Sequence, residues 1–207
     1  MNVIEIIGLA FGAAWTSGIN LYATVAVLGL LQRYELVGRL PGALDVLDNW
    51  WIIGVALALY AVEFVADKVP YVDTVWDAVH TFIRVPAGAI IALSATADLD
   101  PALRVVALLV GGGLALSTHG TKATVRAAAN VSPEPVTNWA LSFLEDVFAV
   151  GALVLAVLHP VVILVVIFIF LLVLVWILPK VVRRLRRMFA SARDFFGGRS
   201  AGDAPRA

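Results

Sequence analysis

Long apolar segments alternate with short polar connections along most of the chain, a pattern that predicts membrane-spanning helices. A helix of about 20 residues crosses a hydrocarbon core of roughly 30 Å. The uncharged run 160–179 is the clearest candidate. Five weaker candidates precede it, at 3–31, 50–66, 73–97, 102–129 and 136–158. Proline-containing turns such as Pro41-Gly42 and Asp100-Pro101 separate them. The chain is therefore predicted to be all-α, a polytopic membrane bundle of about six transmembrane helices.

The composition supports a membrane protein. Of the 207 residues, 61% are hydrophobic and 14% are charged, and the mean hydropathy is +0.95. Soluble domains are about half apolar and a quarter charged. The chain has no cysteine, which excludes disulfides, thiolate catalysis and cysteine-ligated metal centres. The start of the chain, with Glu5 and no basic residue, is unlike a signal peptide, so we expect the first helix to be retained.

The net charge is zero, but bases concentrate at the C-terminal end. Residues 180–207 hold eight Lys or Arg against two acids. Because basic residues beside membrane helices stay in the cytoplasm, we expect the C-terminus inside, and six crossings then place the N-terminus inside as well. The prediction is a multi-pass membrane protein with a transmembrane domain at 1–180 and a basic cytoplasmic tail at 181–207. The tail is expected to bind anionic lipid, and its end to be disordered.

A weak internal repeat links two hairpins. At a constant offset of 63, five residues of the first hairpin match five of the second: Pro70, Thr74, Trp76, Gly88 and Ala89 against Pro133, Thr137, Trp139, Gly151 and Ala152. The two hairpins would be parallel repeats, and transporters often place their sites where repeats meet. Chance agreement between helices of similar composition is the alternative.

Charged residues lie inside the predicted membrane segments, at spacings that give shared helix faces. One stripe consists of Asp73, Asp77, His80 and Arg84, and a second of His119, Lys122 and Arg126. Glu63 and Asp67 lie one turn apart, and Asn138, Ser142 and Glu145 share a face with Asp146 beside them. We expect a central network with Arg84 opposite Glu145 or Asp146. Lys122 and Arg126 would face Glu63, Asp67, Asp73 or Asp77. The network either holds the helices in register or lines a water-accessible cavity for a solute or ion.

Polar and small residues also interrupt the middle of the first segment. Gly18, Asn20, Tyr22 and Thr24 suit a broken helix that lines a cavity. The alternative is a continuous helix packed closely through its small residues. Gly88 and the run 111–113 are similar candidates for a kink or a close helix crossing.

Motifs for known chemistry are absent: the sequence has no HExxH, GxSxG, Walker loop or GxGxxG. The three histidines lie on different segments, so their spacing gives no support to a metal site. We therefore expect no cofactor, no catalytic residue and no nucleic-acid partner. The lipid bilayer is the expected partner, and a homo-oligomer is a further expectation because the protomer is small.

Several polar stretches resemble a family of bacterial integral membrane proteins catalogued as domain of unknown function 4126. They are SGINLYATVAVLGL at 17–30, YAVEFVADKVPYVDTVWDAVHTFIRVPAGA at 60–89, and HGTKATVRAAANVSPEPVTNWALSFLEDV at 119–147. His159-Pro160 also matches. The resemblance implies a small bacterial inner-membrane protein, and it transfers no site assignment.

These observations favour a small-solute or ion transporter or channel with a charged intramembrane cavity. A lipid head-group enzyme or flippase, or a non-catalytic scaffold, are the alternatives. The candidate cavity residues are Asn20, Tyr22, Glu63, Asp67, Lys68, Asp73, Asp77, His80, Arg84, His119, Lys122, Arg126, Asn138, Glu145 and Asp146.

Overall fold

The computed structural model describes residues 1–69, 71–130 and 135–197, without the side chains of 135, 182 and 184–197. The described residues form seven α-helices and one 3₁₀ helix, and no strand. In chain order these are α1 (Val3–Ser17), α2 (Leu21–Arg33), η1 (Gly42–Asp48), α3 (Trp50–Ala66), α4 (Val72–Ala95), α5 (Pro101–Ala129), α6 (Pro135–Leu158) and α7 (Pro160–Gly197). Met1–Val165 form one compact unit and Val166–Ala207 a second.

Four helices of the described chain are long and apolar enough to cross a membrane: α4, α5, α6 and the 160–181 part of α7. A fifth span is counted if η1 and α3, which are bent by 78° at their junction, are taken together. The prediction of an all-α membrane bundle is thus confirmed, with four or five long spans where six were expected. Two expected spans account for the difference. The first apolar segment consists of two short helices, and α3 counts as a span only together with η1.

That first segment is two helices, so of the two interpretations left open for 3–31 the continuous helix is wrong. Helix α1 ends at Ser17, and Asn20, in an extended conformation, caps α2 by accepting the backbone N–H of Ala23. With 15 and 13 residues, the two helices are roughly 22 and 20 Å long, shorter than the hydrocarbon core. The break follows from a glycine, which favours helix poorly, followed by a strong capping residue. The broken-helix interpretation is confirmed.

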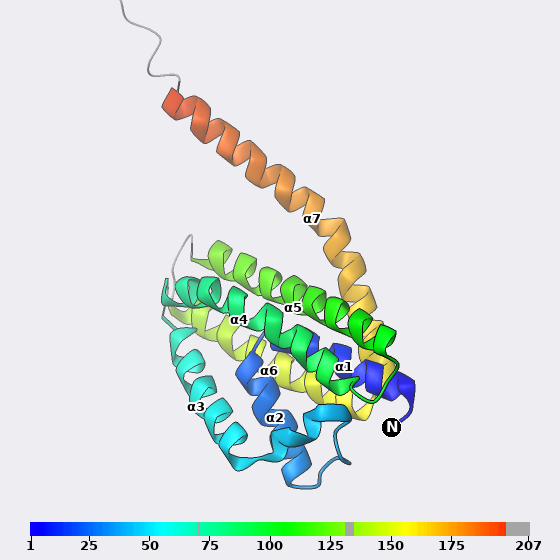
Figure 1. Cartoon of the computed structure of the whole chain (residues 1–207). Coiled ribbons are helices and arrows are strands. Elements are labelled where there is room, and N and C mark those ends of the chain that lie inside the picture. The colour runs from blue at the N-terminus through cyan, green and yellow to red at the C-terminus, as the bar shows by residue number, and fades with distance from the viewer. Residues whose placement is uncertain (70, 131–134, 198–207) are drawn as a thin grey trace, which may run out of the picture. The chain divides into compact units, whose positions relative to one another are not determined.

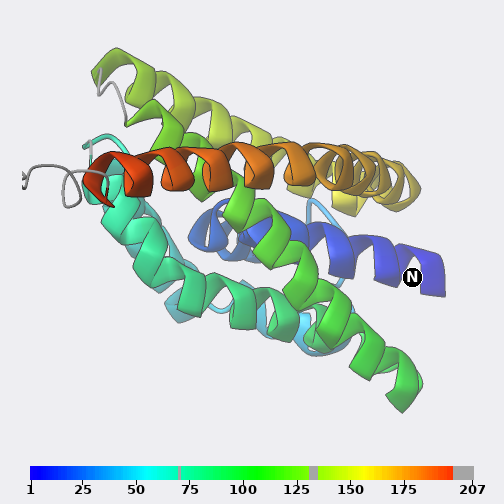
Figure 2. The ribbon, with the colours of Figure 1, turned by 90° about the horizontal axis from the view of Figure 1, so that it is seen from above.

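Helix α1 is the centre of the first unit. It packs against α4, α5 and α6, which flank it in Figures 1 and 2, and α4 and α5 form the most extensive helix pair. Helix α2 turns away from α1 and packs against α3 and η1 (Figure 1). The hydrophobic core contains Leu9, Ala10, Ala13 and Ala14 of α1. Burial continues to Ser17, so the C-terminal half of α1 is packed among the longer helices α4, α5 and α6.

Glycines allow α1, α4 and α5 to approach closely, as expected for Gly88 and Gly111. A Cβ added at Gly111 would clash with the Cβ of Ala92 and lie 2.9 Å from the carbonyl oxygen of Gly88. A Cβ at Gly88 would in turn clash with Ala115. Small residues at such crossings are a common basis of helix packing in membranes.

The helix bounds follow the offset of 63 seen in the sequence. Helix α4 covers 72–95 and α6 covers 135–158, so both ends agree with the offset, and α3 and α5 end 63 residues apart, at 66 and 129. The helices on either side of the two connections thus have matching bounds at this offset.

The backbone of the predicted tail is described as far as Gly197. Helix α7 continues to Gly197, while residues 198–207, expected to be disordered, are outside the described residues. Lys180 lies over the ring of Trp176. Lipid binding by the tail and the cytoplasmic placement of both termini stay predictions.

The triple glycine of α5 provides a matched test of the α4–α5 crossing. We expect Gly111→Ala to destabilise the protein by about 1–3 kcal/mol because the added methyl group overpacks the crossing. Gly113→Ala should instead stabilise it by about 0.5–1 kcal/mol, since that position is open and alanine favours helix. Denaturant unfolding in detergent micelles measures both. Equal effects of the two substitutions would contradict the close crossing.

Candidate functional site

Helix α4 has its charged face inside the protein and its apolar face outside. Its four predicted stripe residues, Asp73, Asp77, His80 and Arg84, are all buried. Its exposed positions are apolar: Val75, Val79 and Phe82 are 65, 55 and 83% exposed. Since lipid favours apolar side chains and penalises charges, this arrangement is the one a membrane-embedded helix requires. The predicted shared face is confirmed.

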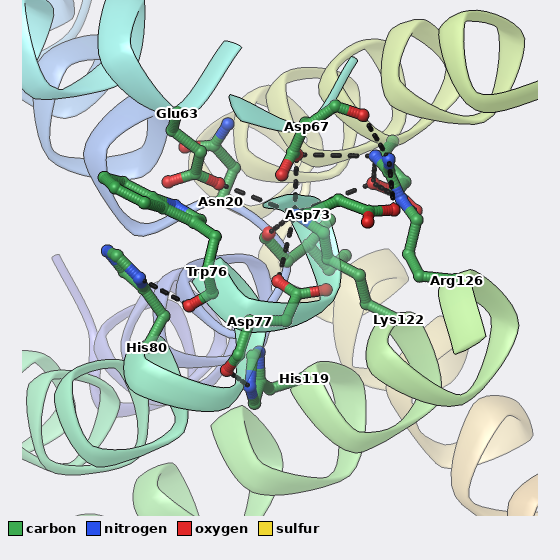
Figure 3. Close-up of polar contacts among 12 residues, drawn as sticks. Asn20, Glu63, Asp67, Asp73, Trp76, Asp77, His80, His119, Lys122 and Arg126 are labelled. Atoms are coloured by element: carbon green, nitrogen blue, oxygen red, sulfur yellow. Dashed lines mark hydrogen bonds and ion pairs between the residues drawn. The ribbon is translucent and has the colours of Figure 1, made fainter. Parts of the chain in front are cut away.

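The other predicted charged residues meet this stripe from α3, α5 and α6 and from the connection between α3 and α4. We call the nine ionisable side chains that gather here the charge cluster: Glu63, Asp67, Asp73, Asp77, Arg84, Lys122, Arg126, Glu145 and Asp146. Figure 3 labels Glu63, Asp67, Asp73, Asp77, Lys122 and Arg126 among them. All are buried except Glu145, whose side chain is 17% exposed. The charges thus converge inside the bundle, as expected.

Arg84 pairs with α3, not with α6. Its Nη2 lies 2.5 Å from Oε1 of Glu63, and its Nη1 lies 3.5 Å from Oδ1 of Asp77. Nη1 also donates, at 3.4 Å, to the carbonyl oxygen of Gly18 in the break between α1 and α2. The prediction that Arg84 faces Glu145 or Asp146 is wrong, because helix spacing defines a face but not the helix that meets it.

Contact with Arg84 fixes the protonation of His119. Nη1 of Arg84 lies 3.2 Å from Nδ1 of His119. A guanidinium only donates, so Nδ1 accepts and the ring proton is assigned to Nε2. Nε2 lies 3.0 Å from the carbonyl oxygen of Asp77 and 2.8 Å from Oγ1 of Thr81. His119 is therefore neutral while Arg84 holds this position.

Lys122 is the cation with the largest number of acidic neighbours. Its Nζ atom has five oxygens within 3.8 Å: Asp67 Oδ2 at 2.8 Å, the Ile19 carbonyl at 3.3 Å, Glu63 Oε1 at 3.5 Å, Glu145 Oε2 at 3.6 Å and Asp77 Oδ1 at 3.8 Å. The expected partners Glu63, Asp67 and Asp77 are thus present.

Arg126 joins the connection after α3 to α6. It donates to both carboxylate oxygens of Glu145, with Nη2 2.5 Å from Oε2. Its Nη1 donates at 2.6 Å to the backbone oxygen of Asp67 and lies 3.7 Å from Oδ2 of Asp73. Bidentate pairs of this kind are among the strongest in proteins. Arg126 therefore faces Asp67 and Asp73 as expected, and Glu145 in addition.

Two asparagines continue the network from Asp73. Asn130 donates to both oxygens of Asp73, at 2.9 and 3.0 Å, and accepts a hydrogen bond from Asn138 at 3.1 Å. Asn130 was not among the predicted residues. It lies four residues after Arg126 on the same helix face, so the spacing that identified Arg126 could have found it.

Asp146 is held by neutral groups. Asn20 donates to its Oδ1 at 2.9 Å, and the Tyr60 hydroxyl donates to its Oδ2 at 3.3 Å. No Lys or Arg side chain described in the structure lies within ion-pair distance of it. Tyr60 was missed from the sequence, although it lies one helical turn before Glu63. Asn20, in the break between α1 and α2, thus caps α2 with its side-chain oxygen and donates to Asp146 with its side-chain nitrogen.

Tyr22, His80 and Lys68 lie at the edge of the cluster. The Tyr22 hydroxyl is 3.2 Å from Nε2 of His80, whose Nδ1 donates to the carbonyl of Trp76 at 2.8 Å. Lys68 is half-buried and donates to Ser142 Oγ at 3.2 Å and to the carbonyl of Phe64 at 3.0 Å. These three candidates surround the network without joining its ion pairs.

Within the cluster, carboxylates outnumber cations. Six acids, Glu63, Asp67, Asp73, Asp77, Glu145 and Asp146, face three cations, Arg84, Lys122 and Arg126. Three buried oxygens lack a hydrogen-bond partner within the described chain: Glu63 Oε2, Asp67 Oδ1 and Asp77 Oδ2. Unpaired buried carboxylate oxygens are costly, so they mark places where a proton or a cation would be stabilised.

Asp67 lies in the connection between α3 and α4, outside both helices. Burial by itself would raise the pKa of its carboxyl, but Lys122 and Arg126 outweigh burial and hold the pKa below its ordinary value. The stabilisation that its ion pairs provide is therefore complete above the ordinary pKa of an aspartate and is lost as the pH falls through the lowered value.

No group of three or more His, Asp or Glu side chains in the described residues is arranged to hold a metal ion. The fold and the cluster define a helical membrane protein with an ion-paired interior. The family model described as domain of unknown function (DUF4126) matches residues 7–180, and the chain belongs to this family. No curated protein and no solved structure matches the chain.

A double-mutant comparison tests the pairing of Arg84. We expect Arg84→Met to cost about 3–5 kcal/mol of stability, because the buried Glu63 loses its closest ion pair and keeps only the longer contact to Lys122 at 3.5 Å. Adding Glu63→Gln should recover part of that loss, since the poorly compensated charge is removed. Adding Glu145→Gln should recover none, because Glu145 pairs with Arg126. Unfolding in detergent micelles measures all three variants, and better recovery by Glu145→Gln would refute the assigned pair.

Proposed function

We propose that the protein moves a small cation, a proton or a monovalent metal or ammonium ion, across the membrane through the charge cluster. The observation that carries this proposal is the excess of buried carboxylates over cations. Buried ionisable residues in membrane helices commonly mark ion and proton pathways. A net negative interior attracts positive solutes, so the charge sign of the cargo follows from the cluster.

The excess of acids argues against a purely structural network. A scaffold of buried ion pairs is tolerable because each charge has a partner. Here Asp146 is buried and held by Asn20 and Tyr60 alone among the described residues, without a cation. An acid that adds negative charge without pairing weakens a scaffold, while in a transport site it provides a place for the cargo.

The broken helix supports the same proposal. At the break, the carbonyl oxygens of Gly18 and Ile19 face Arg84 and Lys122. Transporters often form cation sites from unwound backbone carbonyls near the middle of the membrane. The break and the carboxylates thus offer oxygen atoms of two kinds to one cation.

Flux through liposomes tests the proposal. Purified protein reconstituted in liposomes should dissipate an imposed proton, sodium, potassium or ammonium gradient faster than empty liposomes. Asp146→Asn should lower the rate by about tenfold, equivalent to about 1.4 kcal/mol in the barrier. This variant removes a charge without orphaning a cation, so the protein should still fold.

The matched control is Asp45→Asn, which breaks the surface ion pair with the exposed Arg39. It should leave the flux unchanged. Absence of flux for every cation tested, from folded wild-type protein, would overturn the proposal. Turnover or movement of a labelled lipid without cation flux would instead favour the lipid enzyme or flippase.

A further inference from the structure

Within the charge cluster the three cations are held unequally. Arg84 and Arg126 each make an ion-pair contact of 2.5 Å to a carboxylate and also donate to backbone carbonyls. Lys122 has one short contact, to Asp67 at 2.8 Å, and its other four oxygens are 3.3–3.8 Å away. The arginines therefore form a fixed frame, and the lysine ammonium is the loosely held charge.

The oxygens around Lys122 come from five separate segments of the chain, all outside α5, which carries Lys122 itself. They belong to the α1–α2 break, to α3, to the connection after α3, to α4 and to α6: Ile19, Glu63, Asp67, Asp77 and Glu145. Convergence of oxygens from five separate segments on one point is the arrangement of a cation site. Here the point is filled by a cation that the chain itself provides.

Three of these carboxylates have a second oxygen to offer. Glu63 Oε2, Asp67 Oδ1 and Asp77 Oδ2 are buried and have no hydrogen-bond partner in the described chain, and Glu63 and Asp77 are 0 and 2% exposed. Lys122 uses one oxygen of each. The site thus has more acceptor capacity than one ammonium with three protons can use.

The size of the site favours a monovalent cation over a divalent one. Calcium sits about 2.3–2.6 Å from its oxygen ligands and magnesium closer still. The oxygens around Nζ begin at 2.8 Å and extend to 3.8 Å. Such a wide shell suits a large, weakly held ion, for which an ammonium group is the direct model.

We propose that the ammonium group of Lys122 occupies the binding site of a monovalent cation of ammonium size, and that this cation binds there when the lysine side chain moves aside. The inference rests on the proposed transport of a cation and names where the cation binds. The lysine stem is long and flexible, and its charge is compact, so it can leave without disturbing the arginine frame.

Removing the lysine should open the site to free ions. We expect the melting temperature of Lys122→Ala in detergent micelles to rise by about 3 °C or more when choline chloride is replaced by ammonium chloride or potassium chloride at constant ionic strength. Wild-type protein should shift by much less, because its own ammonium fills the site. Sodium chloride in a further series tests the size preference.

Lys68→Ala is the matched control, because Lys68 is a neighbouring lysine that contacts Ser142 and a backbone carbonyl but none of the five oxygens. It should behave as wild type. If Lys122→Ala does not fold in any salt, Lys122→Gln, which keeps a polar side chain in the site, is measured in the same way. Ion-induced shifts of the Lys122 variants no larger than those of wild type and Lys68→Ala would overturn the inference.

The melting experiment involves no transport, so the two proposals can fail separately. Selective stabilisation of the Lys122 variants without flux through wild-type protein would keep the cation site and reject transport. Flux without selective stabilisation would keep transport and reject the assignment of the cation to the position of Lys122.

Discussion

The low dielectric of the membrane is the constraint on which the rest of this structure depends. A charge facing lipid is strongly disfavoured, so each helix that carries charges must direct them toward other helices. In α4 this rule fixes the rotation of the helix, because Asp77 and Arg84 are buried while Phe82 is exposed. The same rule applies to α5, where Lys122 and Arg126 face inward. The charge cluster therefore sets the orientation of the helices as well as the chemistry of the interior.

Helical spacing was enough to predict which residues share a face, but not which helix meets that face. The stripe on α4 could be read directly because i, i+4, i+7 and i+11 lie together on any helix. The partner of Arg84 could not, since acids at a similar depth occur on α3 and α6 alike. The structure selects Glu63, because Arg126 takes Glu145. Asn130, the C-cap residue of α5, was missed although it lies four residues after Arg126.

The break in the first apolar segment illustrates a second limit. The residues that favour a broken helix, glycine and asparagine, are the same ones that allow close packing of an unbroken helix. In the structure Gly18 and Asn20 break the helix, and Gly18 also allows close packing. A Cβ on Gly18 would meet the backbone oxygen of Ala115 and the hydroxyl of Thr118, so the break approaches α5 closely. That approach brings the Gly18 and Ile19 carbonyls within reach of Arg84 and Lys122. The close packing of the break against α5 thus also places its carbonyl oxygens in the charge cluster.

An excess of buried acid links stability to ion binding. Any cation that enters the cluster reduces repulsion among the carboxylates, so binding and folding are stabilised by the same contacts. Deleting Arg84 or Arg126 would leave buried carboxylates poorly compensated and destabilise the fold, so a loss of flux in either variant would not report on transport alone. Neutralising Asp146 avoids this problem, because its partners Asn20 and Tyr60 are neutral and remain satisfied by an amide. Asp146, which has no cationic partner among the described residues, is therefore the acid whose substitution tests the proposed transport with the least effect on stability.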